Sequence, residues 1–277
     1  MSGKFVLGSD SEKQAFRSLK ALKAHISTEF GPKTHEAVYA VINTSHPTIA
    51  KNDYTPRILP IPHKLGKVTS QKILLVTKDP SNFYREKISE KGSATEDIFD
   101  SIISFKKLRS IAHSPKSLKK LSYEYDLIVC DHRIHHLLHP ILGPTFYKSN
   151  KKLVFMVQMA KPDAEAQLVR GKKSHKLKDE RCEPEYILKQ IKSIARNSSF
   201  VPSTGSCLSV IIGYSDFEAQ ALTENLNAAI DYLTNKAKFG PVGGIIKNGV
   251  KGIVDVHVKT SESASLPVLE KDRSLTK

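Results

Sequence analysis

The sequence predicts a mixed α/β protein made of two domains, one of which is inserted into the other. The middle of the chain contains short runs of consecutive apolar residues, which are typical of strands covered on both faces of a parallel sheet. The segments on either side combine amphipathic helices with strands of alternating character. These outer segments are therefore expected to form one domain, into which the middle segment is inserted.

The N-terminal segment begins with a predicted helix at residues 9–30, in which apolar residues recur at helical spacing. Ser9 and Glu12 have the spacing of a capping box at the start of this helix. Two extended segments rich in strand-forming residues follow at 37–42 and 57–62. These two segments can pair as strands of one sheet.

The middle segment, residues 68–159, is predicted to be a small α/β unit of its own. Its apolar runs are the expected strands, at 72–77, 126–130 and 153–157. Helical segments are expected between and after these strands, at 81–91, 98–104 and 117–121.

Helices and strands alternate again in the C-terminal segment. They are expected in the order helix, strand, helix, strand at 184–194, 208–212, 217–233 and 253–259. The tail from Glu262 onward is polar and is expected to be frayed. Residues 1–67 and 160–277 are therefore predicted to form one discontinuous α+β domain, with 68–159 inserted into it.

Basic residues outnumber acidic ones, with 43 Lys and Arg against 28 Asp and Glu among 277 residues and a formal net charge of +15. Such a charge favours polyanionic partners such as nucleic acid, although it can also be a solvated surface. A membrane is not an expected partner, because no apolar run approaches the roughly 20 residues that a spanning helix needs. The N-terminus lacks a signal-peptide pattern, so a soluble intracellular protein is expected.

Four histidines stand out at His132, His135, His136 and His139, because a helix would place them on one face. They could bind a transition metal, or they could form an ordinary helix surface that meets phosphate when protonated. Metal sites need a full ligand set with supporting partners, so neither a metal nor another cofactor is predicted. The sequence has no nucleophile motif, CxxC pair or phosphate loop of recognisable spacing, and no enzymatic activity is predicted.

Two clusters of lysines are candidates for phosphate contact. One lies in the loop at the second crossover between the domains and contains Lys172, Lys173, Lys176 and Lys178. The other lies in the middle segment and contains Lys116, Lys119, Lys120, Lys151 and Lys152. Both clusters could instead be merely solvated. RNA is favoured over duplex DNA, because no helix-turn-helix, zinc finger or basic zipper is present.

Four landmarks in a shared order resemble the ribosomal protein L1 superfamily. They are residues 36–38, 60–67 (Pro-Ile-Pro-His-Lys-Leu-Gly-Lys), 141–144 and 217–226. The resemblance implies a split α+β outer domain with an inserted Rossmann-like, three-layer α/β domain. Within the superfamily, residues 72–80 and 258–261 resemble the nucleolar ribosome-biogenesis members of fungi and animals, which include a small-subunit-processome component of similar size.

The resemblance also implies that the outer domain contacts RNA, but the chain departs from the family at three places. The aromatic residue before the first strand is Thr34 here, and the Arg- and Lys-containing loop is replaced by residues 200–205. The family's Ser-Thr-Met-Gly turn corresponds to residues 260–263, with Glu262 in place of Met and Ser263 in place of Gly. These two side chains are expected to face the place of the stalk rRNA backbone and to repel it.

The residues expected to contact RNA are Lys33, Thr34, Glu36, Lys172, Lys173, Lys176, Lys178, Ser203, Thr204, Gly205, Lys259, Thr260, Ser261, Glu262 and Ser263. The expected function is that of a non-catalytic RNA-binding ribosome assembly factor, which acts on pre-rRNA in the nucleolar small-subunit processome of the nucleus. The expected partners are pre-rRNA, pre-ribosomal assembly factors and ribosomal proteins, with no membrane and no small-molecule substrate. Two alternatives stay open: a cytoplasmic ribosomal protein of the large-subunit stalk, and a protein-interaction adaptor of pre-ribosomes that has lost RNA binding.

Overall fold

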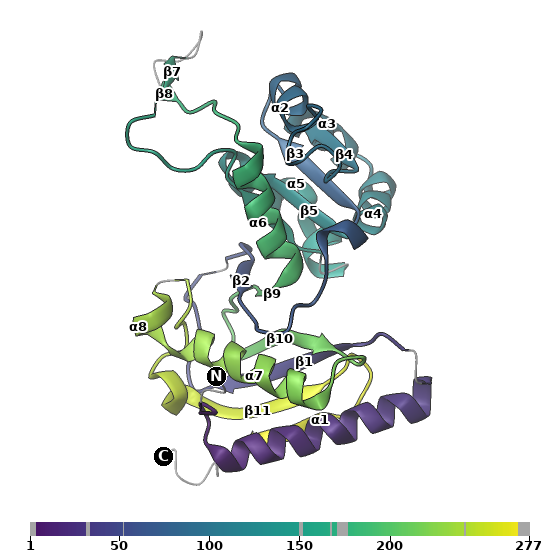
Figure 1. Cartoon of the computed structure of the whole chain (residues 1–277), viewed down its shortest axis with the longest axis vertical. Coiled ribbons are helices and arrows are strands. Elements are labelled where there is room, and N and C mark those ends of the chain that lie inside the picture. The colour runs from purple at the N-terminus through teal and green to yellow at the C-terminus, as the bar shows by residue number, and fades with distance from the viewer. Residues whose placement is uncertain are drawn as a thin grey trace. The chain divides into compact units, whose positions relative to one another are not determined.

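The computed structural model describes residues 4–31, 34–51, 53–149, 152–166, 168–170, 177–240 and 242–270. The chain divides into two units (Figure 1), which we call the outer unit, Met1–Leu65 with Arg196–Lys277, and the inserted unit, Gly66–Ala195. Among the described helices, none is both long and apolar enough to cross a membrane.

The outer unit is built on a four-stranded antiparallel sheet. Its strand order is β10-β1-β11-β12, from Cys207–Tyr214, Ala37–Thr44, Ile253–Lys259 and Leu266–Glu270. Side chains alternate along β1 between buried and partly exposed positions, so one face of the sheet forms the core. The apolar stripes of helices α1 (Ser9–Phe30) and α7 (Ala219–Thr234) complete this core.

Shorter elements close the outer unit. Strand β2 (Arg57–Leu59) pairs with β9 (Ser198–Phe200) in a sheet of their own. Helix α8 (Lys236–Phe239) and the 3-10 turn Gly249–Gly252 follow α7. The possible pairing of 37–42 with 57–62 is therefore wrong, because prolines at 60 and 62 end β2 after three residues and lack the N–H groups that a longer ladder requires.

The buried side chain of Asn225 joins the two sequence segments of the outer unit. Its Oδ1 accepts a hydrogen bond from the His63 backbone N–H at 2.9 Å. Its Nδ2 donates to the carbonyl oxygens of His63 at 2.9 Å and of Ile212 at 2.7 Å. His63 belongs to the first segment, whereas Ile212 lies on β10 in the second, so one amide from α7 fixes the crossover segment against the sheet.

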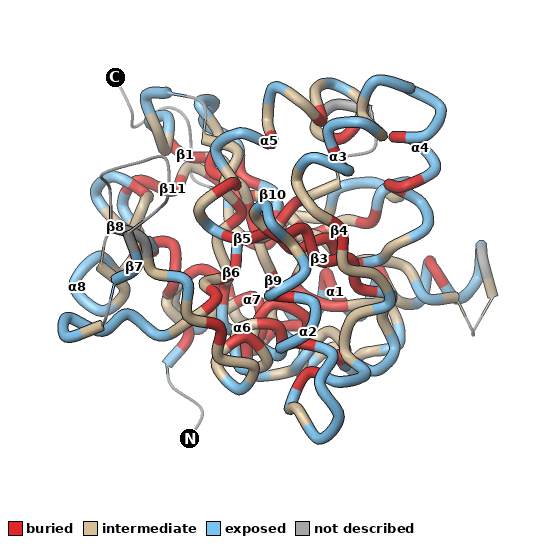
Figure 2. Tube along the Cα trace, turned by 90° about the horizontal axis from the view of Figure 1, so that it is seen from above, coloured by how far each residue is buried: buried red, intermediate tan, exposed pale blue. Residues whose placement is uncertain are grey.

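The inserted unit is built on a parallel sheet. Its order is β4-β3-β5-β6, from Ser101–Ser104, Ile73–Thr77, Leu127–Asp131 and Val154–Val157. Every residue of β3 and β5 is buried (Figure 2), as their continuous apolar runs predict. The helices of this unit are α2 (Asn82–Ile88), α3 (Phe105–Ala112), α4 (Pro115–Glu124), α5 (His132–Pro144) and α6 (Pro184–Arg196). Short turns and strands complete it, at Val68–Ser70, Thr145–Ser149, Val169–Arg170 (β7) and Leu177–Lys178 (β8).

Three local predictions are wrong. The segment predicted as a helix at 98–104 ends in strand β4, whose β-branched Ile102 and Ile103 lie beside β3. The tail predicted to fray contains β12, in which four of the five residues pair with β11. The capping box is absent, because Gly8 occupies the cap position and Ser9 already belongs to α1.

The second domain boundary also differs from the predicted one, because residues 160–195 belong to the inserted unit. Helix α6 is held there by the residues that follow β6. Gln190 Oε1 accepts a hydrogen bond from Gln158 N at 2.9 Å, and Gln190 Nε2 donates to Gln158 O at 2.8 Å. Glu183 N donates to Met159 O at 2.8 Å. The predicted first boundary, at 67/68, lies close to the observed one at 65/66.

The outer unit is expected to fold without the inserted unit. Leu65 N donates to Arg196 O at 2.9 Å, so the two chain ends left by removing Gly66–Ala195 already lie together. A short glycine linker between Leu65 and Arg196 should give a soluble protein with cooperative thermal unfolding by circular dichroism. Joining Lys67 to Ala160 instead should give an insoluble protein, because the apolar face of α6 would be kept while the rest of the inserted unit up to residue 159 would be removed. An unfolded product from the first deletion would contradict this division.

Replacement of Asn225 by Ala is expected to destabilise the outer unit by about 3 kcal/mol, because it removes the partner of three backbone groups beside the core. Urea denaturation measures this change in the free energy of unfolding. Gln220→Ala on the exposed side of the same helix is the control and should change stability by less than about 0.5 kcal/mol. Equal stability of the two variants would show that the amide does not hold the crossover.

Candidate nucleic-acid interface

Three chain segments meet at one end of the outer sheet. Ala37, the first residue of β1, pairs with Tyr214 at the end of β10, and Tyr39 pairs with Lys259 at the end of β11. This antiparallel register brings together the segment before β1 and the segments after β10 and β11. Seven of the predicted contact residues lie at this end: Thr34, Glu36, Lys259, Thr260, Ser261, Glu262 and Ser263. We call this group the sheet-end surface.

Ser215 fixes the approach to β1. Its backbone N–H donates to the Glu36 carbonyl at 2.9 Å, and its hydroxyl accepts from the Glu36 N–H at 3.0 Å. The same hydroxyl donates a short hydrogen bond to the carbonyl of Thr34. Ser215 therefore sets the backbone of two predicted contact residues, and no motif in the sequence indicated this role.

His35 supplies an aromatic ring to the sheet-end surface, although the family's aromatic position is Thr34. The His35 ring is stacked on Tyr214 with 4.1 Å between ring centroids, and its Nδ1 lies 3.3 Å from the Asp216 carboxylate. The side chain is 60% exposed, so its outer face is open to a ligand. An exposed imidazole can stack on a base or, when protonated, contact a phosphate. Sequence reasoning missed this residue; its place next to Thr34 was the available signal.

The turn after β11 is closed by its own side chains. Thr260 N donates to Ser263 Oγ at 2.9 Å, and Ser263 N donates to Thr260 Oγ1 at 3.0 Å. Thr260 is buried, whereas Ser261 and Glu262 are exposed. The hydroxyl of Ser263 thus stabilises the turn, whereas the carboxylate of Glu262 is exposed and accessible to a ligand.

Residues Ser203, Thr204 and Gly205 are not part of the sheet-end surface. They precede β10, whose first residue Cys207 pairs with Asn43 near the end of β1. The eight residues of β10 separate them from the sheet-end surface by about 26 Å along the strand. The antiparallel register places the start and the end of β10 at opposite ends of the sheet, so the structure does not bring these three predicted contact residues together with the other seven.

The other predicted contact residues cannot be placed in the same way. Lys33, Lys172, Lys173 and Lys176 lie outside the described residues. Lys178 lies in β8, where its backbone pairs with Val169 of β7.

Three of the four histidines of α5 make separate contacts. His132 Nδ1 lies 3.5 Å from the Asp131 carboxylate, and His135 Nε2 lies 3.2 Å from the carbonyl oxygen of Val154. The ring of His139 packs beside Tyr147, with 5.1 Å between centroids. In the part of the chain that the structure describes, no group of three or more His, Cys, Asp or Glu side chains could hold a metal ion.

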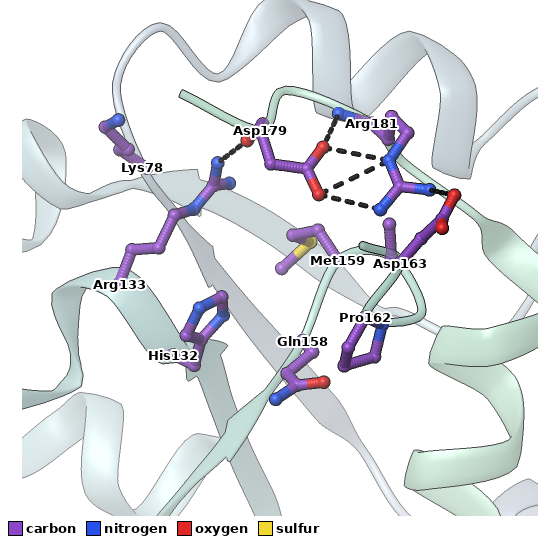
Figure 3. A pocket seen from close by; sticks show the side chains of 10 residues that line it. Lys78, His132, Arg133, Gln158, Met159, Pro162, Asp163, Asp179 and Arg181 are labelled. Carbon is purple, nitrogen blue, oxygen red and sulfur yellow. Dashed lines mark hydrogen bonds and ion pairs between the residues drawn. The ribbon is translucent and has the colours of Figure 1, made fainter. Parts of the chain in front are cut away.

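A crevice of about 450 Å³ lies at the carboxyl ends of the parallel strands in the inserted unit (Figure 3). Lys78 follows β3, His132 and Arg133 follow β5, and Gln158 follows β6. Ligands of open parallel sheets bind at this end of the strands. The sequence did not predict this crevice, because the residues that line it come from segments far apart in the sequence.

The charged groups of the crevice neutralise one another. Asp131 is fully buried, and both of its carboxylate oxygens accept hydrogen bonds from Arg133, which also donates to Tyr84. Burial alone would lower the pKa of Arg133, but the hydrogen bonds and charge of Asp131 outweigh burial and raise this pKa. Hydrogen bonds from the Arg181 side chain likewise lower the pKa of Asp179. These ion pairs tie the loops together.

Comparison with known proteins identifies the family to which the chain is similar. The model of the ribosomal protein L1p/L10e family matches residues 22–264. The chain is 38% identical over 258 residues to the ribosome biogenesis protein UTP30 of Saccharomyces cerevisiae, which covers 92% of this chain and 89% of the yeast protein.

Two proteins of Schizosaccharomyces pombe that carry the name of ribosome biogenesis proteins are also similar. One is 25% identical over 200 residues, covering 72% of this chain and 45% of the relative. The other is 22% identical over 260 residues, covering 94% and 79%. The family match and the yeast relative confirm the resemblance seen in the four landmarks. The chain belongs to the ribosomal protein L1p/L10e family.

Proposed function

We propose that this protein is a non-catalytic ribosome assembly factor that binds pre-rRNA in the nucleolar small-subunit processome. The observation that carries the proposal is the 38% identity to UTP30 over 92% of the chain, since that relative is named for ribosome biogenesis. The net charge of +15 supports a polyanionic partner. The proposed site of action is the nucleolus, and the proposed partners are pre-rRNA, other assembly factors and ribosomal proteins.

The outer unit is the proposed RNA-binding part. Its sheet-end surface offers the exposed His35 ring, the Lys259 side chain and the polar turn after β11. These are the groups that contact unpaired bases and phosphates in RNA complexes. The inserted unit is proposed to contact neighbouring proteins or a second RNA segment.

RNA crosslinking in cells tests the function directly. Crosslinks to small-subunit precursor RNA are the expected result. Crosslinks to mature stalk rRNA would instead identify a large-subunit ribosomal protein, and the family match makes this the natural second candidate. An absence of RNA crosslinks would leave a protein-interaction adaptor.

The salt dependence of RNA binding tests the four predicted contact lysines between residues 172 and 178 of the inserted unit. Replacing Lys172, Lys173, Lys176 and Lys178 by Ala is expected to reduce the slope of log affinity against log salt by about 3, at roughly 0.7 to 0.9 per lost phosphate contact. The measurement is fluorescence anisotropy on a pre-rRNA fragment over a range of salt concentrations. A control with Lys13, Arg17, Lys20 and Lys189 replaced by Ala removes four exposed charges from helices. Equal slopes for the two variants would mean that the four lysines between residues 172 and 178 are merely solvated.

Glu262 is expected to weaken binding to stalk rRNA relative to a ribosomal family member. Replacing Glu262 by Met should raise affinity for a stalk rRNA fragment roughly fivefold, because a carboxylate near a phosphate costs about 1 kcal/mol in water. Ser263→Gly alone should bring no gain, since it removes the hydroxyl that closes the turn with Thr260. Wild-type protein that binds this fragment as tightly as the ribosomal member, at equal salt, would contradict the prediction and support the large-subunit alternative.

A further inference from the structure

Helices α3 and α4 form a hairpin with an unusual charge. The stretch from residue 101 to residue 123 contains six Lys and Arg residues and no Asp or Glu. All six side chains are exposed. They are Lys106, Lys107, Arg109, Lys116, Lys119 and Lys120. The two helices contact each other, and these cations make the hairpin strongly positive.

Three lysines and a tyrosine recur at helical spacing on the exposed face of α4. Lys116, Lys119, Lys120 and Tyr123 follow the spacing i, i+3, i+4, i+7, which places them in one stripe along the helix. Leu118 and Leu121 are buried on the other side. Tyr123 is 70% exposed, which is a high value for an aromatic side chain in a folded protein. We call these four residues the α4 stripe.

The α4 stripe is poorly placed for the stability of its own helix. Lys116 lies in the first turn, where the helix dipole disfavours a cation, and this turn contains no acidic residue. The helix is capped by the neutral hydroxyl of Ser114. Lys116 and Lys120 are like charges at i, i+4, which also disfavours the helix. Lys116 therefore carries a cost in folding that an anionic ligand would relieve.

Two arginines of the inserted unit are neutralised within the fold. Arg133 is paired with Asp131, and Arg181 lies within 4 Å of three carboxylates. By contrast, no ion pair joins the lysines of the α4 stripe to an acidic side chain among the residues that the structure describes. The positive charge of the hairpin is thus available to a partner.

We propose that the α4 stripe binds single-stranded RNA, with its three ammonium groups on phosphates and the Tyr123 ring stacked on a base. Lysines beside an exposed aromatic side chain are the combination that binds unpaired nucleic acid, because the cations follow the backbone and the ring takes a base. The three cations of α3 extend the positive field along the same hairpin. An acidic protein segment would use the lysines alone, and duplex RNA offers no unstacked base to the ring. The inference rests on the proposed function and gives the inserted unit an RNA site separate from the sheet-end surface.

The test uses the full-length chain and a fluorescently labelled uridine oligonucleotide. The triple variant Lys116→Gln, Lys119→Gln, Lys120→Gln is expected to reduce the slope of log affinity against log salt by about 2. The charge-matched control is Lys13→Gln, Arg17→Gln, Lys20→Gln, which removes three exposed cations from α1 in the outer unit. This control should leave the slope within error of the wild type. Circular dichroism verifies that both proteins are folded.

Tyr123 provides a second readout that loss of charge cannot mimic. Tyr123→Ala is expected to weaken binding about tenfold at every salt concentration without a change in slope, because stacking is not a charge interaction. Tyr123→Phe retains the ring and should bind like the wild type.

Four outcomes overturn the proposal. The first is an equal slope for the triple variant and its control, and the second is wild-type affinity of Tyr123→Ala. The third is an RNA duplex that competes for binding as well as the single strand does. The fourth is a polyglutamate peptide that competes as well as the single strand does. If the full-length chain binds neither the uridine oligonucleotide nor a pre-rRNA fragment, the proposed function fails as well. If the chain binds RNA and the hairpin variants bind it unchanged, only the inference about α4 fails.

Discussion

The outer unit depends on the three hydrogen bonds of the buried Asn225 side chain. This unit is assembled from two stretches of chain separated by the whole inserted unit, so contacts between the stretches must hold it together. The amide satisfies both backbone groups of His63 in the first stretch and the carbonyl of Ile212 in the second. Buried backbone groups without partners are costly, and a single side chain from α7 therefore sets where the chain leaves and re-enters the unit. The Leu65 to Arg196 hydrogen bond then keeps the two crossovers side by side.

With the crossovers fixed, the antiparallel register decides which residues can act together. Strand β1 comes from the first stretch and lies between β10 and β11 from the second. Its pairing gathers the segments around Thr34, Ser215 and Thr260 at one end of the sheet. The same pairing carries Ser203–Gly205 to the other end. Loops at a sheet end can change without disturbing the ladder, so a substitution such as Glu262 can alter the ligand while leaving the fold unchanged.

The inserted unit contains cations in two kinds of environment. One kind stabilises the fold, and the other belongs to the proposed RNA site. In the crevice, Arg133 and Arg181 are surrounded by carboxylates and hold loops together. On α4, lysines occupy a first turn and an i, i+4 pair where they oppose helix formation. Cations beside acids stabilise the fold of the inserted unit, whereas the unfavourable position of Lys116 in its helix supports the proposed role of α4 in binding RNA.

The sequence by itself determined the elements whose signal is local. Continuous apolar runs predicted β3 and β5, and helical spacing predicted α1 and α7, because burial follows the period of each element. The order of elements also predicted an inserted segment, and the four landmark motifs indicated the family. Only the tertiary structure decided features that depend on pairing between distant segments. Ser101–Ser104 and Leu266–Glu270 are strands because β3 and β11 offer them partners, and α6 belongs to the inserted unit because Gln158 bonds to Gln190. His35 meets Tyr214, and Ser203 is kept away from Thr260, through a strand register that no local pattern contains.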